Sequence, residues 1–271
     1  MRWLTEPRTG TLFPQIGSPF AGKRMRSLIL FSLLAFGCGG CASTGASGDS
    51  DVNDPLERAN RAIFRFNRKA DQFVLRPVAS GYHSITPDPL ERSISRFFVN
   101  LSSPIVIVSD LLQGKLKQAG ADTGRFLLNS TVGVLGFLDV ATHVGLEYHD
   151  EDFGQTLGRW GLEQGPYFIV PIFGPYTLRD GFGRVLELPF ELINHIDDSR
   201  TRRGLALLYY IDKRARLLVG DDALANAFDP YIFLRDAYLQ RRRYLVYDGD
   251  PPSLEEDFED VYSEEDFLTD D

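Results

Sequence analysis

The stretch RFLLNSTVGVLGFLDVA, residues 125–141, opens the part of the chain that decides the fold. After an acidic turn it continues with FGQTLG, residues 153–158, and ends in GPYFIVPIFGPY, residues 165–176. Pro171 and Pro175 interrupt it, so no run reaches the roughly 18 to 20 apolar residues that span a bilayer. Glycine and proline at this density favour bends and close backbone approach. This middle segment is therefore either a buried, turn-rich core segment or a wall that meets lipid.

Helical patterns precede this segment. We predict a helix capped by Asp54, with Pro55 in its first turn, and a second one begun in the same way at Asp88. The first carries an apolar stripe that we expect to face the core, formed by Leu56, Ala59, Ile63, Phe66, Ala70 and Phe73. Ser103–Pro104 is predicted to open a separate helix over residues 105–117, and another covers residues 119–128.

Helical patterns also follow the middle segment. Residues 181–195 are predicted to form a short helix with its apolar side chains facing inward, namely Phe182, Val185, Leu186 and Phe190. Asp198 or Ser199 is expected to cap a longer helix, and Asp229–Pro230 the last one, residues 231–243. Only residues 167–173 have the composition of a strand. The fold is therefore predicted to be mainly α.

Charge and cysteine content limit the function classes. Residues 248–271 hold twelve Asp and Glu and no Lys or Arg, and without them 29 basic residues face 26 acidic ones. A near-neutral body without a basic stripe argues against nucleic-acid binding, and we expect the acidic tail to be disordered. Cys38 and Cys41 are the two cysteines of the chain, so the body has neither a disulfide framework nor a thiolate metal site.

The N-terminal region is typical of a bacterial lipoprotein signal. Lys23, Arg24 and Arg26 precede an apolar run, residues 28–36, and small residues follow. Met25 is an alternative start to Met1. Either Cys38 or Cys41 then accepts the acyl chains that anchor the protein; a plain cleaved signal with incidental cysteines is the alternative. Residues 1–40 are thus an extension with a signal peptide, residues 41–53 a flexible polar tether, and residues 54–247 one helical domain.

We find no constellation that indicates catalysis. The four histidines, His83, His143, His149 and His195, form no metal-binding pair on a helix, and no P-loop, dinucleotide fingerprint or nucleophile elbow is present. His143 and His149 flank an acidic turn that we interpret as a solvated loop rather than a metal site. Arg125 and Arg179 bracket the middle segment and either bind lipid phosphates or pair with carboxylates at helix ends. We expect no catalytic residue, no metal and no cofactor.

Short motifs in a fixed order resemble the MlaA (VacJ) family of outer-membrane lipoproteins. They are DPLE (54–57), NR (60–61), FN (66–67), RPV (76–78), NL (100–101) with Pro104, LQG (112–114), RFLLNSTVG (125–133), GFLDVA (136–141), FGQTLG (153–158), GPY (165–167), TLRD (177–180), DPY (229–231) and RDAY (235–238). The lipidated cysteine of this family is commonly followed by Ala-Ser, which favours Cys41 over Cys38. The extended N-terminus and the long acidic tail depart from the family pattern.

The resemblance implies a helical ring in the inner leaflet of the outer membrane, embedded without spanning it. It also implies removal of stray phospholipid from the outer leaflet, transfer to a periplasmic lipid-carrier protein, and association with a trimeric porin. On that interpretation the candidates for the lipid path or its hinges are Gly133, Gly136, Phe137, Gly154, Arg125 and Arg179. A lipid acyl hydrolase and a scaffold lipoprotein are the competing hypotheses.

Overall fold

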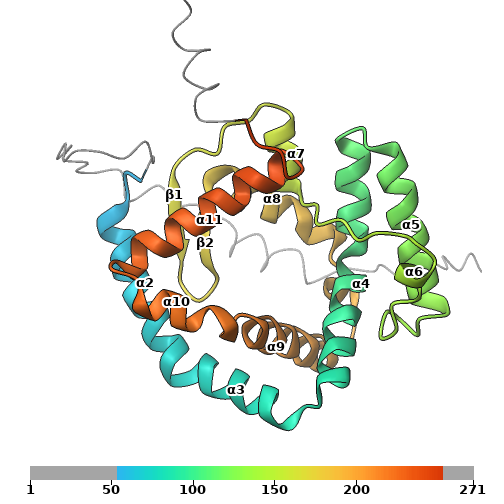
Figure 1. The fold of residues 1–271 in the computed structure, drawn as a ribbon, viewed down its shortest axis with the longest axis horizontal. Helices are drawn as coiled ribbons and strands as arrows, with labels where there is room; N and C mark the ends of the chain where they lie inside the picture. Colours follow the sequence, from blue (N-terminus) through green and yellow to red (C-terminus); the bar gives the residue numbers. More distant parts are fainter. Residues whose placement is uncertain (1–53, 253–271) are drawn as a thin grey trace, which may run out of the picture. The chain divides into compact units, whose positions relative to one another are not determined.

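The computed structural model describes residues 54–252, and these residues are mainly helical (Figure 1). The expected signal peptide, the lipidated cysteine, the tether and most of the acidic tail lie outside the described residues. In chain order the elements are α2 (Glu57–Ala70), the π-helical turn η1 (Asp71–Leu75), α3 (Arg76–Ile85), α4 (Asp88–Leu112), α5 (Leu116–Thr131), α6 (Val140–His143), α7 (Phe153–Arg159), β1 (Tyr167–Val170), β2 (Gly174–Thr177), α8 (Leu178–Glu187), the short turns η2 (Leu188–Phe190) and η3 (Leu192–His195), α9 (Ser199–Arg216), η4 (Leu218–Gly220), α10 (Asp221–Asn226) and α11 (Pro230–Val246).

The helices pack in a closed circuit. α3 packs against α9, α9 against α4, α4 against α7, and α7 against α11. The circuit closes because α11 and α2 both pack against β1, and α2 leads into α3 through η1. Figure 1 shows these elements around a common middle, with α5 and α6 on the far side of α4. The buried carboxylate of Asp212 joins three of them, because it accepts hydrogen bonds from Ser95 on α4 (2.7 Å) and Tyr82 on α3 (3.4 Å). The predicted mainly α, ring-like fold is confirmed.

The middle segment contains the expected strand, β1, which pairs with a second strand, β2, to form a hairpin. β1 and β2 are antiparallel, with Tyr167 opposite Thr177 and Val170 opposite Gly174. Two asparagines of α2 complete the hydrogen bonding along the edge of β1. Asn60 donates to the carbonyl of Tyr167 (3.1 Å) and accepts from the amide of Ile169 (3.0 Å). Asn67, two turns later, repeats this pairing further along the hairpin, so α2 is fixed to the hairpin by polar contacts.

Pro104 lies inside α4 rather than at the start of a separate helix, so that prediction was wrong. A proline in a helix leaves a carbonyl of the preceding turn without its amide partner. The carbonyl that lacks this partner is that of Asn100, and the hydroxyls of Ser102 and Ser103 donate instead to the carbonyls of Phe98 (3.2 Å) and Val99 (3.4 Å), two and one residues before it. Within the described ranges, α4 is the one helix long and apolar enough to cross a membrane, a test that core helices of soluble proteins also pass.

Two of the four predicted helix caps are wrong. The α2 helix begins at Glu57 without a side-chain cap, and Asp54 instead accepts a hydrogen bond from Asn60 (2.9 Å). Asp88 is the first residue of α4, after Pro87. Asp198 and Asp229 are confirmed as caps of α9 and α11. The predicted helix over residues 181–195 is α8 followed by two short turns, because Pro189 interrupts the helical backbone.

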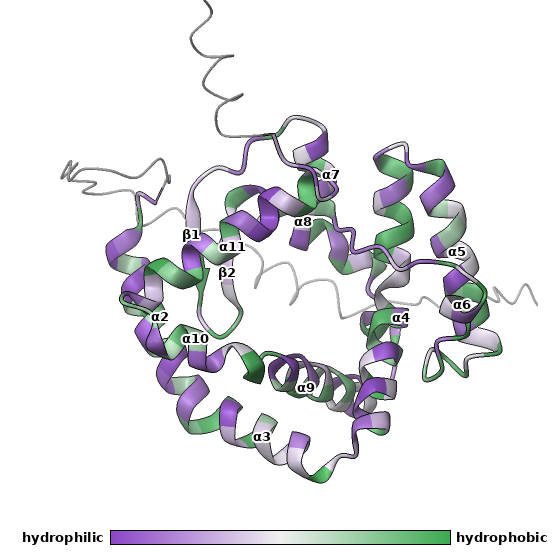
Figure 2. Cartoon of the chain, in the orientation of Figure 1, coloured by the Kyte–Doolittle hydropathy of each residue, from purple (hydrophilic) through white to green (hydrophobic). Residues whose placement is uncertain are grey.

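The predicted buried face of α8 is reversed. On α2 the prediction holds for Ile63, which packs against the buried cluster of the hairpin and α11, but it is wrong for most of the other residues. On α8, Phe182 and Val185 are more than half exposed, whereas Asp180 and Glu187 are buried. Around α2, Asn60 is buried while Phe66, Phe73 and Leu56 are exposed. Periodicity identifies an apolar face but does not say whether protein or another apolar medium covers it. In Figure 2 the turn of the hairpin between β1 and β2 has the colour of hydrophobic residues.

Candidate functional site

Gly133, Gly136 and Phe137 lie together in the turn that follows α5. Three successive residues, Val134, Leu135 and Gly136, have positive φ angles of 53°, 59° and 94°. A left-handed backbone is unfavourable for the branched side chains of Val134 and Leu135. The turn is nevertheless held by bonds from the amide of Gly136 to the carbonyl of Asn129 (2.7 Å) and from Leu138 to Gly133 (2.9 Å).

No room exists for side chains at the two glycines of this turn. A Cβ on Gly133 would lie 2.3 Å from the carbonyl oxygen of Leu138, and one on Gly136 would lie 2.4 Å from the Cβ of Asn100 on α4. Phe137 stacks on Phe97 of α4, with ring centroids 5.0 Å apart. The turn is therefore pressed against α4, while the side chains of its other apolar residues are more than half exposed, namely Val132, Val134, Leu135 and Leu138.

Arg125 is buried beneath this turn and paired with Asp139 (3.2 Å). Its guanidinium also donates to the hydroxyl of Thr142 (3.1 Å) and to the carbonyl of Leu146. Burial opposes ionisation of Asp139, but hydrogen bonds from Thr142 and Asn129 and the charge of Arg125 lower its pKa. The charge of Arg125 is therefore neutralised by Asp139, whose carboxylate caps α6. This contact supports the interpretation that Arg125 pairs with a carboxylate at a helix end rather than with a lipid phosphate.

A cavity of about 230 Å³ adjoins Arg125 between α4 and α5. Arg96 and Asn100 of α4 and Asp122 of α5 line it, together with Tyr148. Figure 1 shows that α5 lies on the far side of α4 from the middle of the circuit. Arg125 therefore belongs to a pocket beside the circuit.

Gly154 and Arg179 belong to a second network, which joins α7, α8 and α11. Arg242 of α11 contacts both oxygens of Asp152 (2.5 and 2.9 Å) and also donates to Asp180 (3.0 Å). Arg179 donates to the same oxygen of Asp180 (3.1 Å). Burial disfavours the charge on Asp152, yet the hydrogen bonds and charge of Arg242 lower its pKa.

The α7 and α8 helices cross with their backbones in contact. A Cβ on Gly183 of α8 would lie 2.4 Å from the amide nitrogen of Gly154 on α7, and one on Gly154 would lie 2.7 Å from the carboxylate of Asp180. Two facing glycines are thus required for the Arg242 network to form. The sequence analysis recognised Gly154 but missed Gly183 and Arg242, which lies 62 residues from one partner and 90 from the other.

The two groups of predicted residues remain separate. In residues 54–252 no hydrogen bond or ion pair joins the network of Arg125 to that of Arg242. Each of the four histidines contacts an oxygen: Glu91 for His83, the carbonyl of Asp139 for His143, Asp122 for His149 and the carbonyl of Glu191 for His195. No cluster of potential metal ligands is found in these residues.

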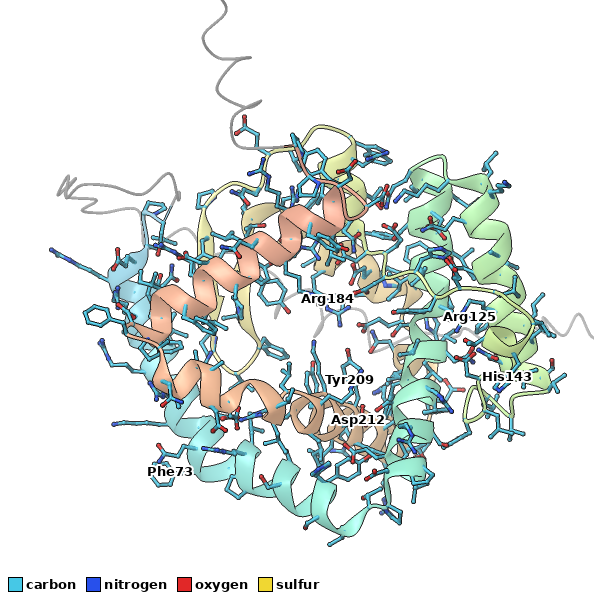
Figure 3. The ribbon with its side chains drawn as sticks, in the orientation of Figure 1. Phe73, Arg125, His143, Arg184, Tyr209 and Asp212 are labelled. Carbon is cyan, nitrogen blue, oxygen red and sulfur yellow. The ribbon has the colours of Figure 1, made fainter. Side chains whose placement is uncertain are left out.

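Side chains that the sequence analysis did not single out face the middle of the circuit. In Figure 3, Arg184 from α8 and Tyr209 from α9 point into it, whereas Phe73 points away from the molecule. Arg184 pairs with Glu187 (2.9 Å) and with Glu191. Of these labelled side chains, an arginine and a tyrosine therefore face the middle of the circuit, and an apolar phenylalanine faces outward.

Comparison with known proteins fits this architecture. The family model described as "MlaA lipoprotein" matches residues 52–245. The chain belongs to the MlaA lipoprotein family. It is 34% identical over 237 residues to the "Intermembrane phospholipid transport system lipoprotein MlaA" of Escherichia coli (strain K12), covering 83% of this chain and 94% of that protein. The protein of the same name from Haemophilus influenzae is 30% identical over 235 residues, which are 83% of this chain and 92% of that one.

A solved structure supports the same assignment. It comes from work on the "structural basis for maintenance of bacterial outer membrane lipid asymmetry". It is 35% identical in sequence and superposes with a TM-score of 0.64, over 71% of this chain and 98% of the other. The family model, which matches residues 52–245, covers nearly the same part of the chain as the described residues 54–252.

Proposed function

We propose that this chain removes mislocalised phospholipid from the outer leaflet of the outer membrane and passes it to a periplasmic carrier protein. Its relatives are named as lipoproteins of an intermembrane phospholipid transport system. The observation that carries the proposal for this chain is the reversed burial of its helices. Charged pairs such as Arg242–Asp180 lie inside, and large apolar side chains such as Phe73 and Phe182 lie outside.

Reversed burial is unfavourable in water and favourable in a lipid leaflet. Burying a side chain of Phe, Leu or Val fully is worth about 1.5–3 kcal/mol, so covering a half-exposed one gains on the order of 1 kcal/mol. The outward apolar groups include Phe66, Phe73, Val134, Leu135, Ile172, Phe173, Phe182 and Val185. Exposed apolar surface of this kind marks an interface with a membrane or a partner. Irregular backbone suits a leaflet where its polar groups are bonded within the protein, as they are along the edge of β1 facing α2 and in the turn after α5.

The anchor in this proposal is a lipidated Cys41, with Cys38 as the alternative. Both lie outside the described residues. Replacement Cys41→Ser is expected to abolish palmitate labelling and to release the protein from membranes. Labelling that persists in this variant would move the anchor to Cys38. A trimeric porin and a periplasmic carrier remain the proposed protein partners, on the basis of the family resemblance.

The transport proposal is tested in a deletion strain and in the same strain carrying the intact gene. We expect intact phospholipid to accumulate at the cell surface in the deletion strain, with lysophospholipid and free fatty acid unchanged. The alternative function is a lipid acyl hydrolase. A normal surface together with the disappearance of a lipolysis product would favour that hydrolase and refute transport.

A further inference from the structure

The α2 helix carries a stripe of basic residues on the face turned away from the hairpin. Arg58, Arg65 and Lys69 are separated by seven and then four residues, which places them along one side of a helix. Asn60 and Asn67, whose hydrogen bonds fix α2 to the hairpin, lie on the opposite side. All three basic residues are exposed. This basic stripe therefore faces away from the protein.

The basic stripe has no carboxylate partner, unlike the neighbouring cation of the same helix. Arg61 pairs with Glu57 (2.6 Å) and with Asp229 (2.9 Å). Within residues 54–252 we find no ion pair for any member of the stripe. The dipole of α2 does not account for these charges either, because it attracts cations only near a free C-terminus. The backbone here continues helically through η1 into α3. The stripe therefore suits an anionic partner outside the chain.

An apolar edge lies beside the basic stripe. Phe66, the residue after Arg65, is 54% exposed, and Phe73 in η1 is 73% exposed. Phe73 points away from the molecule in Figure 3. Exposed apolar side chains next to cations are typical of helices that lie at a membrane interface, where the apolar groups enter the acyl region and the cations stay at the headgroups. A lipid leaflet would meet both features at once.

The place of α2 in the chain also favours a membrane as its partner. Asp54, just before α2, follows Cys41 by 13 residues (54 − 41). An extended chain spans at most about 3.6 Å per residue, so the proposed lipid anchor lies within roughly 47 Å of the start of α2. An anchor at this range keeps a second, weaker membrane contact at a high effective concentration. Acyl chains and a polybasic patch are a combination that gives stable membrane attachment.

We propose that the outer face of α2 binds the anionic headgroups of the leaflet in which the protein lies. The cations of the basic stripe contact lipid phosphates, and Phe66 and Phe73 enter the acyl region beside them. This inference rests on the proposed placement in a leaflet and adds to it a preference for anionic phospholipid. The lipids bound at this face are neighbours of the protein in the leaflet, outside the circuit, and are not the transported molecule.

The test measures which lipids surround α2 in a bilayer. The full chain, with a fluorescent amino acid in place of the exposed Ala62, is reconstituted into vesicles of phosphatidylcholine with a minority of phosphatidylglycerol. Bromine on the acyl chains of one lipid or the other quenches the fluorophore, and the two quenching curves give the association constant of phosphatidylglycerol relative to phosphatidylcholine. Each cation near an anionic leaflet contributes about a factor of five. The relative constant should therefore fall roughly 5- to 25-fold in Arg65→Gln/Lys69→Gln.

A matched control removes two exposed arginines elsewhere, by Arg200→Gln/Arg203→Gln at the start of α9. The far end of α9 is the one that contacts η1. A second variant, Arg65→Lys/Lys69→Arg, keeps the charge of the stripe. Both should retain the relative constant of the unmodified stripe, and circular dichroism checks that the helices of every variant are intact.

Each outcome supports or overturns the inference. Equal quenching by the two lipids with the stripe intact, or a relative constant that is unchanged in the glutamine variant, overturns it. If neither lipid quenches the fluorophore, α2 does not lie in the leaflet, and an acidic protein becomes the favoured occupant of this face. Transport is tested separately by the surface phospholipid of the deletion strain. A normal surface there would refute transport and leave the quenching result unchanged.

Discussion

The crossing of α7 and α8 offers a quantitative test of the fold, through the replacement Gly183→Ala. Gly183 is the sixth residue of the ten-residue helix α8, and its missing side chain points at the backbone of Gly154. A matched control exists in α3, where Gly81 is also the sixth residue of a ten-residue helix. A Cβ on Gly81 would meet nothing within 4 Å.

The expected effects differ in sign. Alanine is favoured over glycine inside a helix by about 1 kcal/mol, and this gain applies to both positions. At Gly183 the new Cβ would lie 2.4 Å from a backbone nitrogen and 2.8 Å from the Cα of Gly154, atoms that cannot rotate away. Overpacking of this kind costs about 1–3 kcal/mol. Gly81→Ala should therefore raise the free energy of unfolding. The free energy of unfolding of Gly183→Ala should be lower than that of Gly81→Ala by the overpacking cost.

Thermal unfolding of the full chains in detergent, followed by far-ultraviolet circular dichroism at one scan rate, measures the difference. A change of 1 kcal/mol shifts Tm by about 2–4 °C in a domain of this size, so a difference of about 1–3 kcal/mol should separate the two variants by roughly 2–12 °C. Equal melting temperatures for the two variants would refute the close contact between α7 and α8.

Three further predictions follow from the buried networks. Removing Arg242 by Arg242→Met leaves Asp152 and Asp180 without their shared partner, so the free energy of unfolding should drop by about 3–5 kcal/mol; a drop below 1 kcal/mol in denaturant unfolding would contradict the pairing. Burial and the carboxylates of Asp122 and Glu151 raise the pKa of Asp110 to about 7. Between about pH 4 and pH 7 the folded state therefore binds a proton that the unfolded state has released. The free energy of unfolding falls as the pH rises through this range, by at most about 1.4 kcal/mol per pH unit. Asp110→Asn should remove that slope in unfolding measured at pH 5 and pH 7, and an unchanged slope would disprove the assignment. Valine at Gly133, Gly136 or Gly154 should abolish lipid asymmetry while palmitate labelling persists, because each Cβ collides with neighbouring atoms; normal asymmetry in these variants would show that the glycines are dispensable.

Local sequence signals predicted the helices and the hairpin strand well. The caps at Asp198 and Asp229 are short-range features, since each carboxylate bonds an amide two or three residues later. The strand composition of residues 167–173 likewise depends on neighbouring residues. Asp54 misled the analysis because its carboxylate instead bonds Asn60 and Tyr231, the latter 177 residues away, and this pairing has no local signature.

The candidate site was predictable only in part, because its contacts are long-range. Gly154 belongs to a recognisable motif, but the reason it must be glycine is Gly183, which lies on another helix. Arg242 stands in a run of three arginines, residues 241–243, and nothing in that run distinguishes it from its neighbours.

The reversed faces explain why glycines and charges hold this fold together. Between helices that face lipid, the hydrophobic effect provides little attraction, because the acyl chains are as apolar as the side chains. Close packing through small residues and polar bonds between helices then stabilises the contacts. Gly154 against Gly183 gives such close packing, and Arg242 gives such bonds in the same crossing. On the proposed placement in a leaflet, the apolar stripe of α8 is a lipid-facing surface, and the polar face opposite it is what joins α8 to α7 and α11.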